Sequence, residues 1–148
     1  MAVARGLLGL ALIAMVALNV ANALGRYLFG RAIEGSDELL VFTMIALVFL
    51  GAPLVAAEGR HLRFDALAGR LPGRRLVETV GLAFAALLLG WLAWHSLGAV
   101  ERLAGLGQRS MALGLPMAIP HAAVTAGLGL SALVALGALL GRVGRGRP

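Results

Sequence analysis

An uncharged stretch of about 19 residues, Leu39–Ala57, constrains the fold of this chain more than any other feature. A helix rises about 1.5 Å per residue, so this stretch is long enough to cross the roughly 30 Å hydrocarbon core of a bilayer. It ends at Glu58, and five arginines follow before the next apolar run. We therefore expect the chain to cross a membrane here, and the arginines indicate the side on which it leaves.

Three further runs are also long and apolar enough to cross, which places the expected spans at about 7–25, 39–57, 80–100 and 119–140. Ser36 as N-cap, with Asp37 and Glu38 in the first turn, predicts the start of the second helix. Pro116 and Pro120 predict an irregular start to the fourth helix. The predicted fold class is an all-α membrane protein with four transmembrane helices in a single domain covering residues 1–148.

The composition supports a membrane protein. The chain is 60% apolar and only 14% charged, so a water-soluble globule would have too little polar surface to cover itself. The absence of cysteine excludes disulfides and thiolate metal sites. The net charge is +6, but the basic residues form no stripe interleaved with aromatics. We therefore expect the lipid bilayer, and no nucleic acid, as a partner.

The first run has an alternative interpretation as a cleaved secretory signal, because Arg5 precedes it and Ala21-Asn22-Ala23 resembles a small-residue cleavage site. The run Leu7–Leu24 is longer than the apolar region of about 7–15 residues in such signals. Three more spans follow it. An uncleaved first helix is the simpler expectation.

The distribution of arginines predicts the orientation. One precedes the first span, two lie in the first connection, five in the second, two in the third, and three follow the last span. With both termini in the cytoplasm, nine arginines lie inside and four outside, as the positive-inside rule prefers. We therefore expect an N-in and C-in topology.

The second connection has a helical pattern of its own. Apolar residues at positions 64, 67, 68 and 71 share one face of a helix, which predicts a short amphipathic interfacial helix over Asp65–Leu71. Pro72-Gly73 would end it. The alternative is a solvated linker in which these apolar residues have no common role.

The predicted spans carry almost no ionisable group near the bilayer midplane, where a transporter that binds its own cargo usually places them. The first span has Asn19 and Asn22, and amides in membrane helices are more often interhelical hydrogen-bonding groups than ligand sites. Gly127, Ser131 and Ala135 recur every four residues in the fourth span, a spacing that permits close helix packing.

Two histidines allow a different function. With the expected topology, His95 and His121 lie toward the same leaflet, where such a pair could ligate a haem, as in cytochrome b-like membrane anchors. The alternative is that each is a polar residue near the interface. An absorption spectrum with a strong Soret band would support the haem hypothesis.

At the expected outer end, Arg26-Tyr27-x-Phe29 faces Asp37-Glu38 across a short connection. The charges can pair and close this hairpin, or they can form part of a docking surface. Nucleophile–base arrangements, phosphate-binding loops and zinc-binding spacings are missing from the sequence. We therefore predict that the chain is not an enzyme and has no catalytic, cofactor or metal site.

Several short motifs, in this order and spacing, resemble one family: the small membrane subunit (DctQ type) of tripartite ATP-independent periplasmic (TRAP) transporters. Each motif alone is weak, but together they cover most of the chain. They are Asn22-x-x-x-Arg26-Tyr27-x-Phe29, Asp37-Glu38-Leu39, Phe49-Leu50-Gly51-Ala52, Gly59-Arg60-His61-Leu62-Arg63-Phe64-Asp65 with Leu71-Pro72, and Ser110-x-x-Leu113-Gly114-Leu115-Pro116 with Pro120.

The sequence departs from the family pattern at three places. Gly35-Ser36 stands where the family often has a tryptophan, His121 stands for an aromatic residue, and a proline expected near Thr125 is missing. These differences affect the outer surface and the last helix.

The resemblance implies a role in a secondary importer of organic acids, driven by a sodium or proton gradient across the bacterial inner membrane. A large membrane subunit (DctM type) would move the substrate, and a periplasmic binding protein (DctP type) would deliver it. This chain would be the multi-pass scaffold and docking partner of the large subunit. The interface or structural residues that the resemblance implies are Asn22, Arg26, Tyr27, Asp37, Glu38, Arg60, His61, Asp65, Ser110 and Pro116.

Overall fold

The structure is a computed structural model that describes residues 2–57 and 74–144. These residues form four helices: α1 (Ala2–Phe29), α2 (Ser36–Ala57), α4 (Arg74–Gly105) and α5 (Ala118–Gly144). All four are long and apolar enough to cross a membrane, which confirms the predicted class of all-α membrane protein. The predicted interfacial helix over Asp65–Leu71, together with Arg60, His61 and Asp65, lies outside the described residues.

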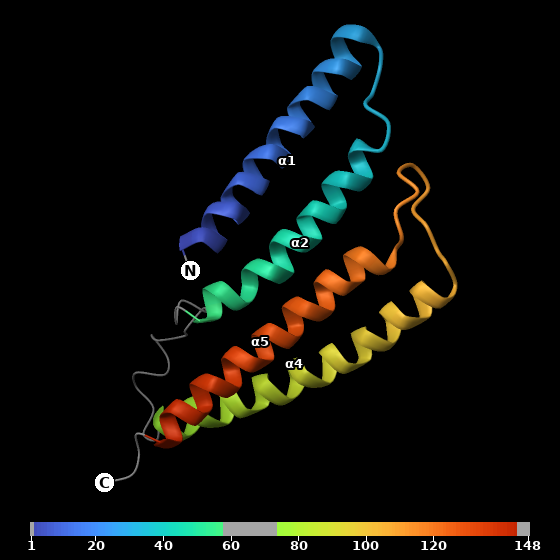
Figure 1. Cartoon of the computed structure of the whole chain (residues 1–148). Helices are drawn as coiled ribbons and strands as arrows, with labels where there is room; N and C mark the ends of the chain where they lie inside the picture. Colours follow the sequence, from blue (N-terminus) through green and yellow to red (C-terminus); the bar gives the residue numbers. More distant parts are fainter. Residues whose placement is uncertain (1, 58–73, 145–148) are drawn as a thin grey trace.

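The helices lie in a row in the order α1, α2, α5, α4 (Figure 1). α1 runs antiparallel to α2 and α4 runs antiparallel to α5, whereas the central neighbours α2 and α5 run parallel. The starts of α1 and α4 and the ends of α2 and α5 lie at one end of the row. The connections α1–α2 (residues 30–35) and α4–α5 (residues 106–117) lie at the other, here called the connection end. α1 and α4 therefore form the two edges of the row, and each has a neighbour on one side.

Each helix extends beyond the span that hydropathy predicts. The third span is expected at about 80–100, whereas α4 covers Arg74–Gly105 and is about 48 Å long at 1.5 Å per residue. The extra turns carry charged residues, which can lie outside the hydrocarbon core without loss of backbone hydrogen bonds. Hydropathy locates the part of a helix within the lipid, and hydrogen bonding sets where the helix ends.

Among the described residues, no hydrophobic side chain is buried. In the most apolar window of each helix, between 0 and 11% of the residues are buried. α2 has apolar residues on all sides, which is typical of a helix in lipid or in the interior of a large assembly. The four helices are consequently not held together by burial of apolar surface from water, and close contacts and hydrogen bonds must hold them.

α2 and α5 approach each other closely at Gly127, which is buried. A Cβ atom added there would lie 2.5 Å from the carbonyl carbon of Phe49 and 2.7 Å from its Cβ. The first member of the predicted Gly127, Ser131, Ala135 series therefore lies at a backbone contact between two helices. Only glycine leaves room for it.

Two polar contacts join α4 to α5. The guanidinium of Arg142 donates to the carboxylate of Glu78 over 2.5 Å, near the start of α4. Further along, the hydroxyls of Ser96 and Thr125 share a hydrogen bond of 2.7 Å. These contacts lie on both sides of the apolar middle of the pair and set the register of α4 against α5.

We expect Gly127→Ala to destabilise the fold, because the added methyl group meets the backbone of α2 and not a flexible side chain. Overpacking of this kind costs about 1–3 kcal/mol. Thermal unfolding of the purified protein in detergent would measure the loss. Gly129→Ala is the matched control on the same helix, since nothing lies within 4 Å of its added Cβ. Equal unfolding midpoints for the two variants would contradict the prediction.

Candidate functional site

The α1–α2 connection is organised around Asn22, whose side chain is only 6% exposed. Its Oδ1 accepts a hydrogen bond of 2.8 Å from the backbone amide of Ile33, and its Nδ2 donates to Asp37 over 3.5 Å. The predicted preference of this amide for a structural role agrees with these contacts. Asn19, one turn earlier, is exposed.

Arg26 and Asp37 approach each other across the same connection, as the sequence hypothesis proposed. The nitrogen–oxygen distance is 4.0 Å, and the two side chains are 57% and 81% exposed. Exposed pairs of this kind contribute about 0–1 kcal/mol. Asn22, which is buried, therefore closes the hairpin more firmly than the ion pair does.

The start of α2 differs by one residue from the prediction. The carbonyl of Gly35, and not that of Ser36, accepts the first helical hydrogen bond, from Leu39 over 3.0 Å. Gly35 has φ +75°, which lets the chain turn into the helix at a position where other residues are strained. Ser36 is already helical and 3% exposed, so the prediction that it is the N-cap is wrong.

Glu38 makes the contacts that sequence reasoning missed. Its Oε1 accepts hydrogen bonds from the amides of Met111 and Ala112, and its Oε2 accepts one from Leu113, each over 2.9 Å. Successive backbone amides of this kind form an anion-binding nest. The acidic pair is thus divided: Asp37 faces Arg26 in its own hairpin, and Glu38 binds the other connection.

The α4–α5 connection has the rigid geometry that this nest requires. Gly107 (φ +62°) ends α4, with the amide of Gln108 donating to Leu103 over 3.3 Å and that of Gly107 to Ala104 over 3.2 Å. These bonds form a Schellman motif, which satisfies the last carbonyls of the helix. The sequence from 108 to 117 can therefore leave α4 in a defined direction.

A short hairpin follows, with one bridge between Arg109 and Pro116. The amide of Ser110 donates to Leu115 over 2.8 Å, and the Ser110 hydroxyl accepts from the amide of Leu115 over 3.1 Å. The guanidinium of Arg109 donates to the carbonyl of Gly114 over 2.9 Å. Ser110 and Pro116, both predicted site residues, thus shape the turn that presents three amides to Glu38.

The structure brings most of the predicted residues to the connection end. Tyr27 lies there too, near the end of α1, but its side chain is 86% exposed and no hydrogen bond joins it to the described residues. The residues that contacts join there are Asn22, Arg26, Asp37, Glu38, Ser110 and Pro116.

The two histidines are held differently. His121 shares a hydrogen bond of 2.8 Å with the carbonyl of Met117 in the preceding turn. His95 is exposed, and its ring contacts the ring of Trp91 edge-on at 4.5 Å. It is Ser96, the next residue, that faces α5. In the described part of the chain, no ring contact or hydrogen bond joins the two imidazoles, so no contact supports the haem hypothesis.

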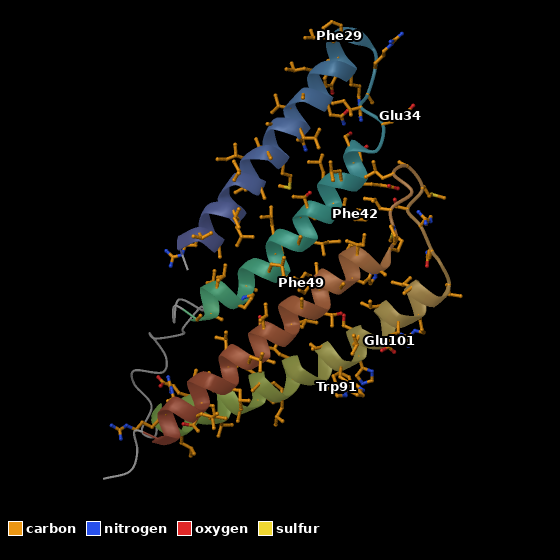
Figure 2. All side chains as sticks on the ribbon, in the orientation of Figure 1. Phe29, Glu34, Phe42, Phe49, Trp91 and Glu101 are labelled. Atoms are coloured by element: carbon orange, nitrogen blue, oxygen red, sulfur yellow. The ribbon has the colours of Figure 1, made fainter. Side chains whose placement is uncertain are left out.

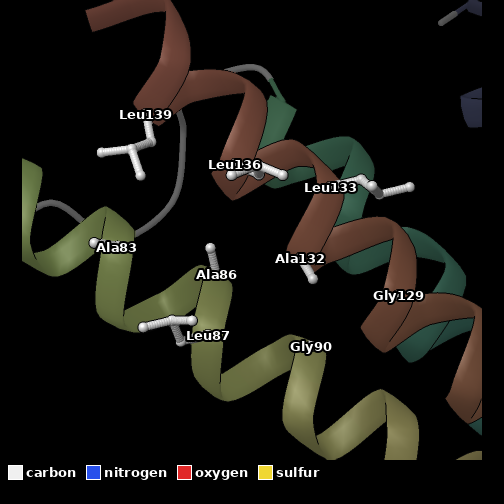
Figure 3. A pocket seen from close by; sticks show the side chains of 9 residues that line it. All are labelled: Ala83, Ala86, Leu87, Gly90, Gly129, Ala132, Leu133, Leu136 and Leu139. Carbon is white, nitrogen blue, oxygen red and sulfur yellow. The ribbon is translucent and has the colours of Figure 1, made fainter. Parts of the chain in front are cut away.

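A groove of about 620 Å³ lies between α4 and α5 (Figure 3). It offers no polar side chain that could bind a carboxylate, so its lining is suited to contact with apolar groups such as lipid tails. The described residues also contain no group of three or more His, Asp or Glu side chains that could hold a metal ion. The residues that line the groove are Ala83, Ala86, Leu87, Gly90, Gly129, Ala132, Leu133, Leu136 and Leu139.

Comparison with known proteins gives the family context. Over residues 8–145 the sequence matches the family described as tripartite ATP-independent periplasmic transporters, DctQ component. It is also 32% identical over 123 residues to the ectoine TRAP transporter small permease protein TeaB of Halomonas elongata. That alignment covers 82% of this chain and 64% of TeaB, so the chain spans a little under two thirds of the length of this relative.

We expect Asn22→Ala to loosen the α1–α2 connection, because it leaves the amide of Ile33 without its acceptor. The expected loss of unfolding free energy is about 1 kcal/mol, measured by thermal unfolding in detergent. Asn19→Ala removes the same side chain from an exposed position on the same helix and should change little. The prediction fails if the two variants unfold at the same temperature as the parent.

Glu38→Gln tests the contact between the connections. Glutamine keeps one acceptor oxygen but directs an amide donor at a backbone N–H, so we expect the amides of residues 111–113 to exchange hydrogen roughly tenfold faster. Hydrogen exchange followed by mass spectrometry would measure it. Glu34→Gln, which alters an acid of the neighbouring α1–α2 connection, is the control. Unchanged exchange in Glu38→Gln would show that the nest does not depend on this carboxylate.

Proposed function

The chain belongs to the DctQ family of tripartite ATP-independent periplasmic transporters, and from this membership we propose that it braces a larger membrane subunit during ion-gradient-driven uptake of organic acids. The chain is a multi-pass membrane protein of a transporter family. The rest of this proposal concerns its role, its partners and its substrate.

One observation supports the proposed scaffold role: the apolar spans contain no charged residue that could bind a charged substrate. No Asp, Glu, Lys or Arg lies within residues 39–57, 79–100 or 110–141. The groove between α4 and α5 is lined by apolar residues throughout. Because a transporter that binds an organic anion by itself needs polar groups at this depth, a subunit without them serves better as a support for one that has them.

The proposed partners are a large membrane subunit of the DctM type and a periplasmic binding protein of the DctP type. The large subunit would bind substrate and ions, and the binding protein would capture the substrate. The relative TeaB is named for ectoine. For this chain we propose an organic acid, because a carboxylate is the substrate class that the family resemblance implies.

We also propose that the protein lies in the bacterial inner membrane with both termini in the cytoplasm. The start of α1 and the end of α5 lie at the same end of the row (Figure 1), which supports placing both termini on one side. Arginines are concentrated in the connection and termini at that end, nine against four, as expected for the cytoplasmic side. The connection end would then face the periplasm.

The connection end is the proposed docking surface for the periplasmic protein. Arg26, Asp37 and Tyr27 are all more than half exposed there. Asn22 and Glu38 hold the underlying backbone in place from both hairpins. A surface with charged exposed groups on a fixed backbone is suited to reversible recognition of a soluble partner.

Reconstitution in lipid vesicles tests the scaffold role. The chain alone should give no uptake of an organic acid under an imposed sodium or proton gradient, because its spans carry no charged binding group. Uptake should appear when the large subunit and the binding protein are added, and the two membrane chains should co-purify. Solute uptake by the chain alone would overturn the proposal.

A further inference from the structure

The middle of α4 carries tryptophan and histidine rings at a depth where lipid tails provide no hydrogen-bond partner. Glu78 and Glu101 bound its uncharged part and lie about 35 Å apart at 1.5 Å per residue, close to the thickness of the hydrocarbon core. Trp91 then lies about 2 Å from the midpoint along the axis, and His95 about 8 Å from it. Tryptophan is common in the interfacial belts and not at this depth.

These rings face away from the other helices. Trp91 and Trp94 are 58% and 74% exposed, and His95 is exposed. Their spacing of three and four residues places them on one face of α4, here called the α4 outer face. Ser96, which bonds to Thr125, marks the side that packs on α5. Figure 2 shows Trp91 on the side of α4 turned away from α5.

The hydrogen-bonding groups of the α4 outer face have no partner within the described residues: Trp91 and His95 make only their mutual ring contact. An indole N–H is a donor only, and a neutral imidazole has one donor and one acceptor. Hydrocarbon contains no water to replace a missing partner, so such groups are costly unless another chain supplies the bond. An exposed polar face at core depth therefore indicates a contact with protein.

The balance of donors and acceptors indicates what kind of protein surface fits. The three rings present three N–H donors and one acceptor nitrogen, so two copies of the face would bring together six donors and two acceptors. A surface rich in carbonyl or hydroxyl oxygens complements their partial positive charge better than a second copy does. The opposite edge of the row, α1, has the single exposed amide of Asn19, which carries donors and acceptor together.

We propose that the α4 outer face is the surface by which this chain binds the larger membrane subunit, through hydrogen-bond acceptors that the larger subunit presents within the bilayer. This inference rests on the proposed function and adds to it the face and the chemistry of the contact. It leaves α1 with Leu10, Ile13 and Val16 exposed to lipid.

The test uses the small and large subunits expressed together, with the affinity tag on the large one. The double variant Trp91→Phe with His95→Phe keeps aromatic rings and removes both N–H groups. We expect the amount of small subunit recovered with the large one to fall roughly tenfold, in line with the loss of interhelical hydrogen bonds. Ile13→Phe, which places an aromatic ring at a 68% exposed position on α1, should leave recovery unchanged.

A photo-reactive residue at position 95 should form an adduct with the large subunit, and one at position 13 should form adducts with lipid. The isolated double variant should keep the unfolding midpoint of the parent, because both side chains are exposed and no ring contact or hydrogen bond joins them to another helix within the described residues. A lower midpoint would show an internal role and would overturn the inference. Adducts of position 95 with lipid alone or with a second copy would overturn it as well.

The same experiment separates the two proposals. If the parent chain binds the large subunit but the double variant binds equally well, the α4 outer face is not the interface and the scaffold role remains. If the parent chain does not bind the large subunit at all, the scaffold role fails and the inference fails with it.

Discussion

The carboxylate of Glu38 connects the two halves of the chain at the connection end. It extends from the first turn of α2 to three amides in the α4–α5 connection, 73 to 75 residues away in the sequence. Gly127 provides the second join between the halves, where the backbones of α2 and α5 meet. The relative position of the two hairpins depends on contacts of this kind because the described residues contain no buried apolar core.

This form of packing is what the bilayer permits. Lipid tails are as apolar as leucine, so helices in a membrane gain little by burying leucine against leucine. Short contacts at Gly127 and hydrogen bonds hold the helices together instead. Ser96–Thr125 joins α4 to α5, and Asn22–Ile33 closes the hairpin at the connection end. A row of four helices held in this way leaves broad apolar faces for lipid or for another membrane protein.

Polar side chains within the hydrocarbon core distinguish the exposed faces of the four helices from one another. An exposed leucine is compatible with lipid, whereas an exposed indole or imidazole near the midplane calls for a hydrogen-bonding partner. The chain belongs to the DctQ component family of tripartite ATP-independent periplasmic transporters. The absence of charged groups from residues 39–57, 79–100 and 110–141 supports the proposed scaffold role. The same physical cost that keeps charges out of the spans makes the rings of Trp91 and His95 informative.

The sequence by itself determined the class of protein, the four apolar spans and the family. Long runs of uncharged, apolar residues are most stable as helices that cross a lipid bilayer. This preference depends only on residues that are neighbours in the sequence, so it can be read without the tertiary structure. The sequence also singled out the residues of the connection end, and it allowed Arg26 to pair with the acids at positions 37 and 38 because they lie close in sequence. Only the tertiary structure decided that Glu38 binds residues 111–113, that Gly35 and not Ser36 precedes α2, and that His95 faces away from α5. These outcomes depend on which helices become neighbours and on how each helix is rotated about its axis. A helix that is apolar on all sides, such as α2, shows no sequence periodicity from which that rotation could be predicted.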